Sequence, residues 1–213
     1  MARHLFVRTL RAIHRQIASS AAAPLLHPRA VESVRRRLIL MRMRDVLEVV
    51  DALDKAGVRV WLAGGWGVDA LIGSQTRVHS DLDLAFEAEG AAGARALEQL
   101  TRLGYRRIES ENAAGKWMPV RICMRDSAGR TVDLLPVTIN RTSLGGGPTG
   151  FRPGAGYPID EFTVGSLDGR PVGCLSAGLQ MAFHEGYEPR GIDRHDVALL
   201  EQRFGLAAPP PYR

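Results

Sequence analysis

Residues 61–87, WLAGGWGVDALIGSQTRVHSDLDLAFE, constrain the fold of this chain more than any other stretch. The stretch opens on the alternating apolar residues of a buried strand and then breaks at Gly64 and Gly65. A short helical segment follows and ends at Gly73, after which residues 80–87 alternate again. The order strand, glycine turn, helix and strand indicates an α+β unit built around one sheet.

The flanking pattern predicts further elements. Apolar residues recur at helical spacing after Asp45, where Asp45 and Glu48 resemble a capping box and Gly57 is a natural stop. The other predicted elements are a helix over 91–103, strands within 117–126 and 131–139, a hairpin over 162–176 that turns at 168–169, and a mostly helical segment over 176–204 with a break at 186–191. This order predicts a mixed sheet with helices on one side.

Three regions are expected along the 213 residues. Residues 1–40 are a basic N-terminal extension, helical or partly disordered; 41–140 are the core; and 141–213 hold a loop, the hairpin and a smaller helical part. Residues 1–44 contain ten arginines and one acid, Glu32. The composition of this extension resembles that of a transit peptide. The alternatives are a loosely attached amphipathic helix, and translation from a start codon upstream of a natural start near Met41 or Met43.

Composition narrows the partners and the compartment. Two cysteines are too few for a disulfide framework, so a reducing cytoplasm is expected. No apolar run approaches the roughly 20 residues of a membrane span, so no membrane partner is expected. The basic residues are nearly all arginine, which indicates coding bias rather than a nucleic-acid site. The oligomeric state is left open.

Asp81 and Asp83 lie two residues apart in the predicted strand, so their side chains project from one face. Carboxylates at this spacing, roughly 7 Å along the backbone, repel each other unless a cation lies between them. A hard cation such as Mg²⁺ binds both and keeps positions for phosphate oxygens. The alternative is a solvated strand edge, which the neighbouring glycine turn disfavours.

Gly64 and Gly65 fit the same purpose. Without Cβ atoms the turn can approach a phosphate closely, and the N–H groups that open the following helix favour anions. A plain turn is the alternative. Asp133, one acid inside the apolar strand TVDLLPV, is the candidate third carboxylate of a two-metal site. Its alternative is an ordinary buried, hydrogen-bonded acid.

The motif GGWGVDALIGSQTRVHSDLDL resembles the nucleotidyltransferases of the DNA polymerase β superfamily. The similarity is greatest to the antibiotic-modifying branch, the aminoglycoside 2''-adenylyltransferases and lincosamide nucleotidyltransferases. It rests on the fifteen residues between Gly65 and Asp81 and on the Thr-Arg-x-His sequence before the acids. The segments VDLLPV, DGRPVGCLS and HEGYEPRGIDRHDVALL also resemble that branch, so the resemblance covers about residues 45–205.

The resemblance implies a polymerase-β-type fold with a mixed sheet flanked by helices. It implies Asp81 and Asp83 as ligands of a pair of Mg²⁺ ions, and Asp133 as a third ligand, the general base or both. The nucleotide-binding residues that we expect are Gly64, Gly65, Trp66, Arg77 and His79. For Arg77 and His79 the alternatives are a surface arginine and a histidine that supports the acids.

The expected reaction is transfer of a nucleoside monophosphate, AMP from ATP or the equivalent from another NTP, to a hydroxyl of a small molecule, with release of pyrophosphate. An aminoglycoside or a lincosamide is the implied acceptor. Leu135 departs from the pattern, because some lincosamide-type relatives are expected to carry a histidine there. The alternatives are a protein or RNA acceptor docked by residues 1–40, and a catalytically silent nucleotide-binding module.

Other side chains have weaker claims. Lys116 and Arg121 flank Trp117 and could clamp phosphate, although exposed basic residues usually bind nothing specific. Cys123 and Cys174 are interpreted as small core residues. A final group fits no zinc signature and is expected mainly to pack the last helix: His184, Glu185, Tyr187, Asp193, His195 and Asp196.

Overall fold

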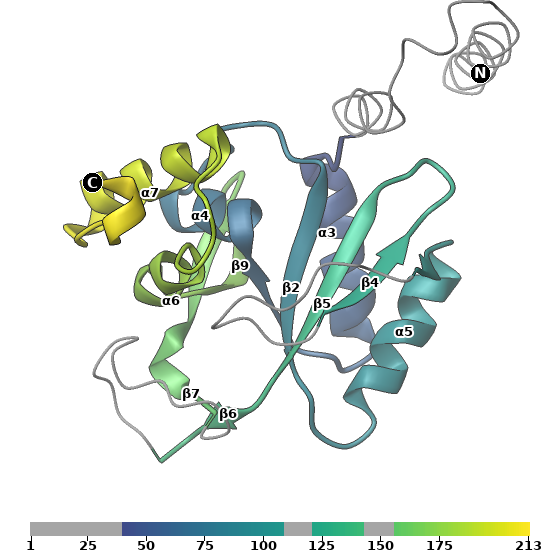
Figure 1. Ribbon diagram of the computed structural model, residues 1–213. Coiled ribbons are helices and arrows are strands. Elements are labelled where there is room, and N and C mark those ends of the chain that lie inside the picture. The colour runs from purple at the N-terminus through teal and green to yellow at the C-terminus, as the bar shows by residue number, and fades with distance from the viewer. Residues whose placement is uncertain (1–39, 109–120, 143–155) are drawn as a thin grey trace, which may run out of the picture. The chain divides into compact units, whose positions relative to one another are not determined.

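A mixed sheet organises the chain from residue 40 to the C-terminus (Figure 1). The computed structural model describes residues 40–108, 121–142 and 156–213. Within these residues the sheet has seven strands in the order β3-β4-β5-β2-β1-β9-β8. The strands are β1 (Val60–Ala63), β2 (Asp81–Glu87), β3 (Arg106–Arg107), β4 (Ile122–Arg125), β5 (Thr131–Val137), β8 (Phe162–Leu167) and β9 (Arg170–Leu175). A separate pair joins β6 (Ile139–Asn140) and β7 (Tyr157–Pro158).

Helices cover both faces of this sheet, so the prediction of helices on one side is wrong. The α-helices are α3 (Met43–Lys55), α4 (Gly64–Ile72), α5 (Ala92–Arg102), α6 (Ala177–Phe183) and α7 (Gly191–Phe204), with short 3₁₀ turns at Ile159–Glu161 and Pro210–Tyr212. Strand residues alternate between the faces, and both sets are buried: Leu82 and Leu84 belong to one hydrophobic cluster, and Ala85 to another.

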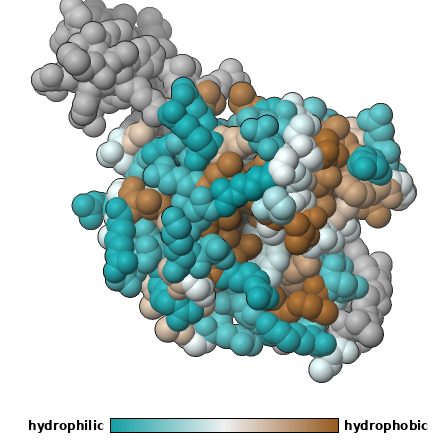
Figure 2. Space-filling view, turned by 180° about the vertical axis from the view of Figure 1, so that it is seen from behind, coloured by the Kyte–Doolittle hydropathy of each residue, from teal (hydrophilic) through white to brown (hydrophobic). Residues whose placement is uncertain are grey.

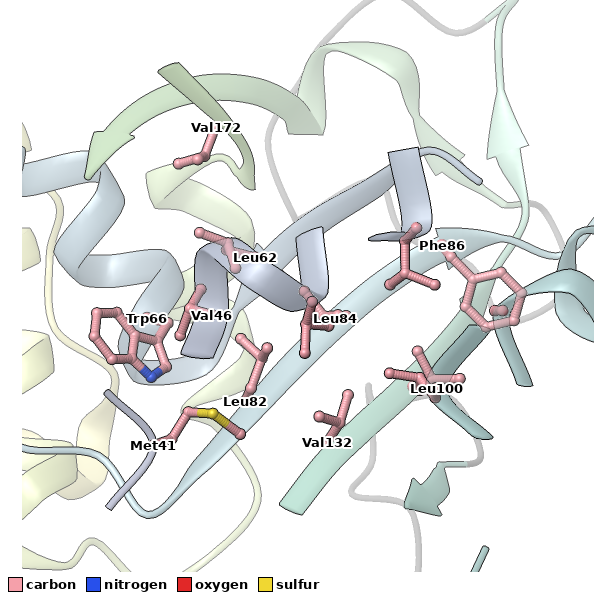
Figure 3. Packing of buried hydrophobic residues seen from close by; sticks show 14 of the residues in the cluster. Met41, Val46, Leu62, Trp66, Leu82, Leu84, Phe86, Leu100, Val132 and Val172 are labelled. Atoms are coloured by element: carbon pink, nitrogen blue, oxygen red, sulfur yellow. The ribbon is translucent and has the colours of Figure 1, made fainter. Parts of the chain in front are cut away.

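The larger cluster lies between the sheet and helices α3 and α5 (Figure 3). Leu62, Leu82, Leu84 and Val132 supply the sheet side, and Val46 supplies part of the α3 side. On the opposite face, α6 packs its apolar side chains onto β1, β2 and β5. The residues of this second cluster are Trp61, Ala63, Ala85, Leu135, Val137, Ile139, Tyr157, Leu175, Leu179 and Phe183.

The start of α3 differs from the prediction. The helix begins at Met43, and the Asp45 carboxylate accepts a hydrogen bond from the Arg42 backbone N–H at 3.1 Å. Asp45 is therefore the third residue of the helix and not its cap, because the residue that precedes the first turn is Arg42. The predicted end is confirmed: the N–H of Gly57 bonds to the carbonyl of Asp54, and Gly57 has φ +67°.

Helices α4, α6 and α7 lie together at one end of the sheet (Figure 1). Val68 of α4, Met181 of α6, and Val197 and Leu200 of α7 share a third hydrophobic cluster. This packing fixes α4 beside the last helix, although α4 and α7 lie more than a hundred residues apart in the sequence.

The predicted hairpin is confirmed: β8 and β9 pair antiparallel around Asp168 and Gly169, which both have positive φ. Because β9 pairs with β1, this hairpin extends the main sheet. The sheet therefore runs across residue 140, where the sequence suggested a division between core and C-terminal part.

The surface seen from behind mixes hydrophobic and hydrophilic side chains (Figure 2). Five large hydrophobic side chains among the described residues are exposed: Val78, Val164, Tyr187, Ile192 and Phe204. No helix in the described ranges is both long and apolar enough to cross a membrane.

Candidate active site

Asp83 and Asp133 lie side by side on neighbouring strands. Strands β2 and β5 run parallel, and their register pairs Asp83 with Asp133 and Asp81 with Thr131. Side chains directly opposite each other in a sheet lie about 5 Å apart at their Cβ atoms, and Asp81 is two residues from Asp83 on the same face. The fold therefore pairs Asp83 with Asp133 on two inner strands and places Asp81 on the same face of the sheet.

The electrostatics of this cluster favour a bound cation. Burial raises the pKa of Asp83 to about 7, and the negative charges of Asp81 and Asp133 add to that effect. Asp83 Oδ1 and Asp133 Oδ1 are buried, and neither has a hydrogen-bond partner within the described ranges. Carboxylate oxygens in this condition match the donor set of Mg²⁺, which takes oxygen ligands.

Arg121 partly neutralises the cluster. Its Nη1 lies 3.1 Å from Asp133 Oδ2 and 3.9 Å from Asp83 Oδ1. Lys116, the other residue that the sequence suggested for clamping phosphate, and Trp117, which the two flank, lie outside the described residues. In the ranges that the structure describes, no three acidic, histidine or cysteine side chains already converge closely enough to hold a metal ion.

Gly64 places the start of α4 against the carboxylates. It has φ +55°, a conformation that favours glycine, and a Cβ at this position would overlap Asp83 Oδ2. The N–H groups of the first turn of α4 therefore open directly beside Asp83. Since these groups lack partners within the helix and carry the positive end of its dipole, they are suited to an anion next to the carboxylates.

Gly65 makes room for two side chains from the segment before β2. A Cβ on Gly65 would overlap Arg77 Nη2 and would lie 2.5 Å from His79 Nδ1. Both predicted nucleotide-binding side chains thus contact the glycine turn itself. The third, Trp66, is 1% exposed and packs its ring at 4.4 Å from the His79 ring.

A buried polar group supports the turn from inside. His79 Nε2 lies 2.5 Å from Asp69 Oδ2, and the Thr76 hydroxyl and backbone N–H donate to Asp69 Oδ1 at 2.6 and 3.0 Å. Burial works against the charged form of Asp69, but the bonds from His79 and Thr76 outweigh it and lower the Asp69 pKa. Asp69 therefore pairs locally, and it fixes the His79 ring beneath the glycine turn.

Arg77 connects the turn to the last helix. Its Nε and Nη2 donate to the two carboxylate oxygens of Asp196 at 2.8 and 2.6 Å. Burial disfavours the charged guanidinium, but these bonds prevail and the pKa of Arg77 is raised. The sequence offered Asp196 only as a packing residue, because its partner lies 119 positions away.

The remaining candidates lie around this site. Burial and the adjacent Asp133 carboxylate raise the pKa of Cys123 to about 12, as for an unreactive core thiol. Leu135 is fully buried in the second cluster. His184 Nδ1 lies 2.8 Å from the Gln180 carbonyl, and its ring packs near Tyr212. His195 Nε2 lies 3.2 Å from the Thr76 hydroxyl, which places α7 against the same support.

A glycine-opened helix between two sheet strands, set against carboxylates on adjacent parallel strands, is the arrangement that the resemblance to nucleotidyltransferases implies. Comparison with known proteins supports this class and narrows it. The model of the aminoglycoside-2''-adenylyltransferase family matches residues 45–200. The chain belongs to this family, which confirms the resemblance drawn from the motif.

Individual relatives agree. A lincosamide resistance protein of Staphylococcus haemolyticus is 30% identical over 161 residues, which cover 74% of this chain and 93% of that protein. The lincomycin-bound crystal structure of lincosamide antibiotic adenylyltransferase LnuA matches with TM-score 0.59 and 26% identity, over 76% of this chain and 98% of that one. ANT(2'')-Ia in complex with adenylyl-2''-tobramycin matches in fold, with TM-score 0.53 and 21% identity, over 74% and 86%.

Proposed function

We propose that this protein transfers AMP from ATP to a hydroxyl of a small acceptor, a lincosamide or an aminoglycoside, and releases pyrophosphate. The observation that carries the proposal is the pairing of Asp83 with Asp133, each with a buried oxygen that accepts no hydrogen bond within the described residues, beside the glycine start of α4. The relatives named above modify antibiotics, which favours the acceptor class. A silent nucleotide-binding module would have no use for such costly carboxylates.

Asp81, Asp83 and Asp133 are the residues that would hold Mg²⁺. Bound there, Mg²⁺ would neutralise charge on the triphosphate and on the acceptor oxygen. Within the described residues these carboxylates do not lie close enough together to hold a metal ion, so metal binding would require them to move closer. The raised pKa of Asp83 requires that its proton leaves when the metal binds.

The protein groups divide the remaining work. The first-turn N–H groups of α4 bind phosphate oxygens, and Gly64 and Gly65 let them approach. Asp133 Oδ1 accepts the proton of the acceptor hydroxyl, whose oxygen forms a bond to the α-phosphorus. The bond from that phosphorus to its bridging oxygen breaks, and pyrophosphate leaves. Positioning and charge neutralisation supply the catalysis.

The test is pyrophosphate release with Mg²⁺ and each NTP, in the presence of pooled lincosamides or pooled aminoglycosides. Asp81→Asn/Asp83→Asn is the inactive variant, and Asp54→Asn, at an exposed position on α3, is the matched control. We expect release that requires one drug pool and both aspartates, and that the control retains. Release that persists in the double variant, or wild-type protein that binds no Mg²⁺–NTP, would refute the proposal.

A further inference from the structure

Two aspartates of the last helix each hold an arginine, and one of these arginines, Arg77, contacts the glycine turn of the candidate active site. Asp193 and Asp196 lie three residues apart on α7 and therefore share a face. Asp196 binds Arg77, and Asp193 binds Arg190, in each case through two guanidinium nitrogens. Both aspartates are at most 3% exposed, so each is a fixed support for its arginine.

The Arg190 side chain is not needed to cap α7. The backbone N–H of Arg190 donates to Asp193 Oδ2 at 2.8 Å, and this bond alone gives the helix its N-terminal cap. The side chain then adds bonds from Nε and Nη2 to the same carboxylate, each at 2.8 Å. It nevertheless stays 69% exposed, and a guanidinium has five N–H donors, so most of its binding capacity remains available.

The negative charge of Asp81 acts on both arginines. Hydrogen bonds to Asp193 raise the pKa of Arg190, and the Asp81 charge contributes to that rise. The same Asp81 charge contributes to the raised pKa of Arg77. Arg77 also contacts the glycine turn through Nη2. Arg77 thus lies at the start of α4 and Arg190 at the start of α7, and aspartates one turn apart on the same helix hold them.

We propose that Arg190 binds the β- and γ-phosphates of the nucleotide together with Arg77, so that α7 forms the side of the site that receives pyrophosphate. This inference rests on the proposed nucleotidyl transfer and assigns a residue to it. A planar guanidinium held by a carboxylate is already oriented, and it can offer parallel N–H groups to phosphate oxygens without further ordering.

The test compares Arg190→Gln with Arg203→Gln in the full-length protein. Arg203 is an exposed arginine in the last turn of the same helix, so it is the matched control. Calorimetry would measure the binding of Mg²⁺–ATP, Mg²⁺–pyrophosphate and AMP to each variant. Arg190→Lys keeps the charge but not the fork, and thermal unfolding checks that each variant folds.

We expect Arg190→Gln to bind Mg²⁺–ATP and Mg²⁺–pyrophosphate at least about tenfold more weakly, in line with the loss of charge-assisted hydrogen bonds. AMP binding and the Arg203→Gln variant should be unchanged, and Arg190→Lys should lie between. Unchanged pyrophosphate binding in Arg190→Gln, or an equal loss for AMP, would overturn the assignment while leaving nucleotidyl transfer intact. A wild type that binds no Mg²⁺–NTP would instead remove the proposed function and the inference with it.

Discussion

Asp83→Asn should stabilise the metal-free protein while removing its metal site. Burial and the charges of Asp81 and Asp133 raise the pKa of Asp83 from 3.8 to about 7. The fold therefore favours the neutral carboxyl. The protonated Asp83 carboxyl therefore stabilises the fold fully below its pKa in the unfolded chain, 3.8, and this stabilisation is lost as the pH rises through about 7, its pKa in the folded protein.

The size of the effect follows from that shift. A rise of about three units, at about 1.4 kcal/mol each, gives an upper bound of about 4 kcal/mol above pH 7. Part of this free energy comes from the interaction of Asp83 with the carboxylates Asp81 and Asp133. We therefore expect Asp83→Asn to stabilise the metal-free protein by about 2 to 4 kcal/mol. For a domain of this size that equals roughly 5 to 15 °C in Tm. Asparagine keeps the shape of the side chain without its charge.

The assay is thermal unfolding in EDTA from pH 5 to 8.5 for wild type, Asp83→Asn and Asp54→Asn. Differences between variants cancel the other titrating groups. The gain of Asp83→Asn should appear near pH 8 and shrink toward pH 5, and Asp54→Asn should show no such trend. Added Mg²⁺–ATP should then stabilise the wild type but not Asp83→Asn. A gain that is absent at pH 8, or constant with pH, would refute the reasoning.

Three further substitutions test the framework around the site. Gly64→Ala should lower the free energy of unfolding by about 1–2 kcal/mol because of its left-handed backbone, and should abolish Mg²⁺–NTP binding because its Cβ overlaps Asp83. Gly73→Ala, at φ +89° with nothing within 4 Å, should show the loss of stability alone. Calorimetry measures the binding, and urea unfolding measures the stability. Asp196→Ala should destabilise the protein by about 3 kcal/mol because Arg77 loses its buried partner. The double variant Arg77→Met/Asp196→Leu should cost less than the sum of its single changes, and strict additivity in urea melts would argue against this coupling. Gly67→Ala should destabilise the protein by about 1–3 kcal/mol, because its Cβ would overlap Gln180 Nε2 and would lie 2.6 Å from the Leu62 carbonyl oxygen. Gly191→Ala, where nothing lies within 4 Å, should leave the stability unchanged or raise it. Equal melting temperatures for the two variants would contradict this.

Local chemistry made much of the fold predictable. Apolar alternation located β2 and β5, the Asp-Gly pair located the β8–β9 turn, and Gly73 ended α4 as expected. The start of α3 was placed too late, because Asp45 lies in the first turn of the helix and its carboxylate accepts a hydrogen bond from the backbone N–H of Arg42. The sequence did not predict a helix on the second face of the sheet. Ala85 and Leu135 lie on that face, and they are buried because α6 covers them.

The sequence by itself determined which groups could meet a metal–triphosphate. The two-residue period of a strand puts Asp81 and Asp83 on one face, and only glycine at position 64 permits the turn beside them. The tertiary structure alone decided that Asp133 lies opposite Asp83 and that Asp196 of α7 binds Arg77 beside the glycine turn. Register between strands 50 residues apart, and contacts across 119 residues, depend on how hydrophobic faces pack, and local propensity does not encode that packing.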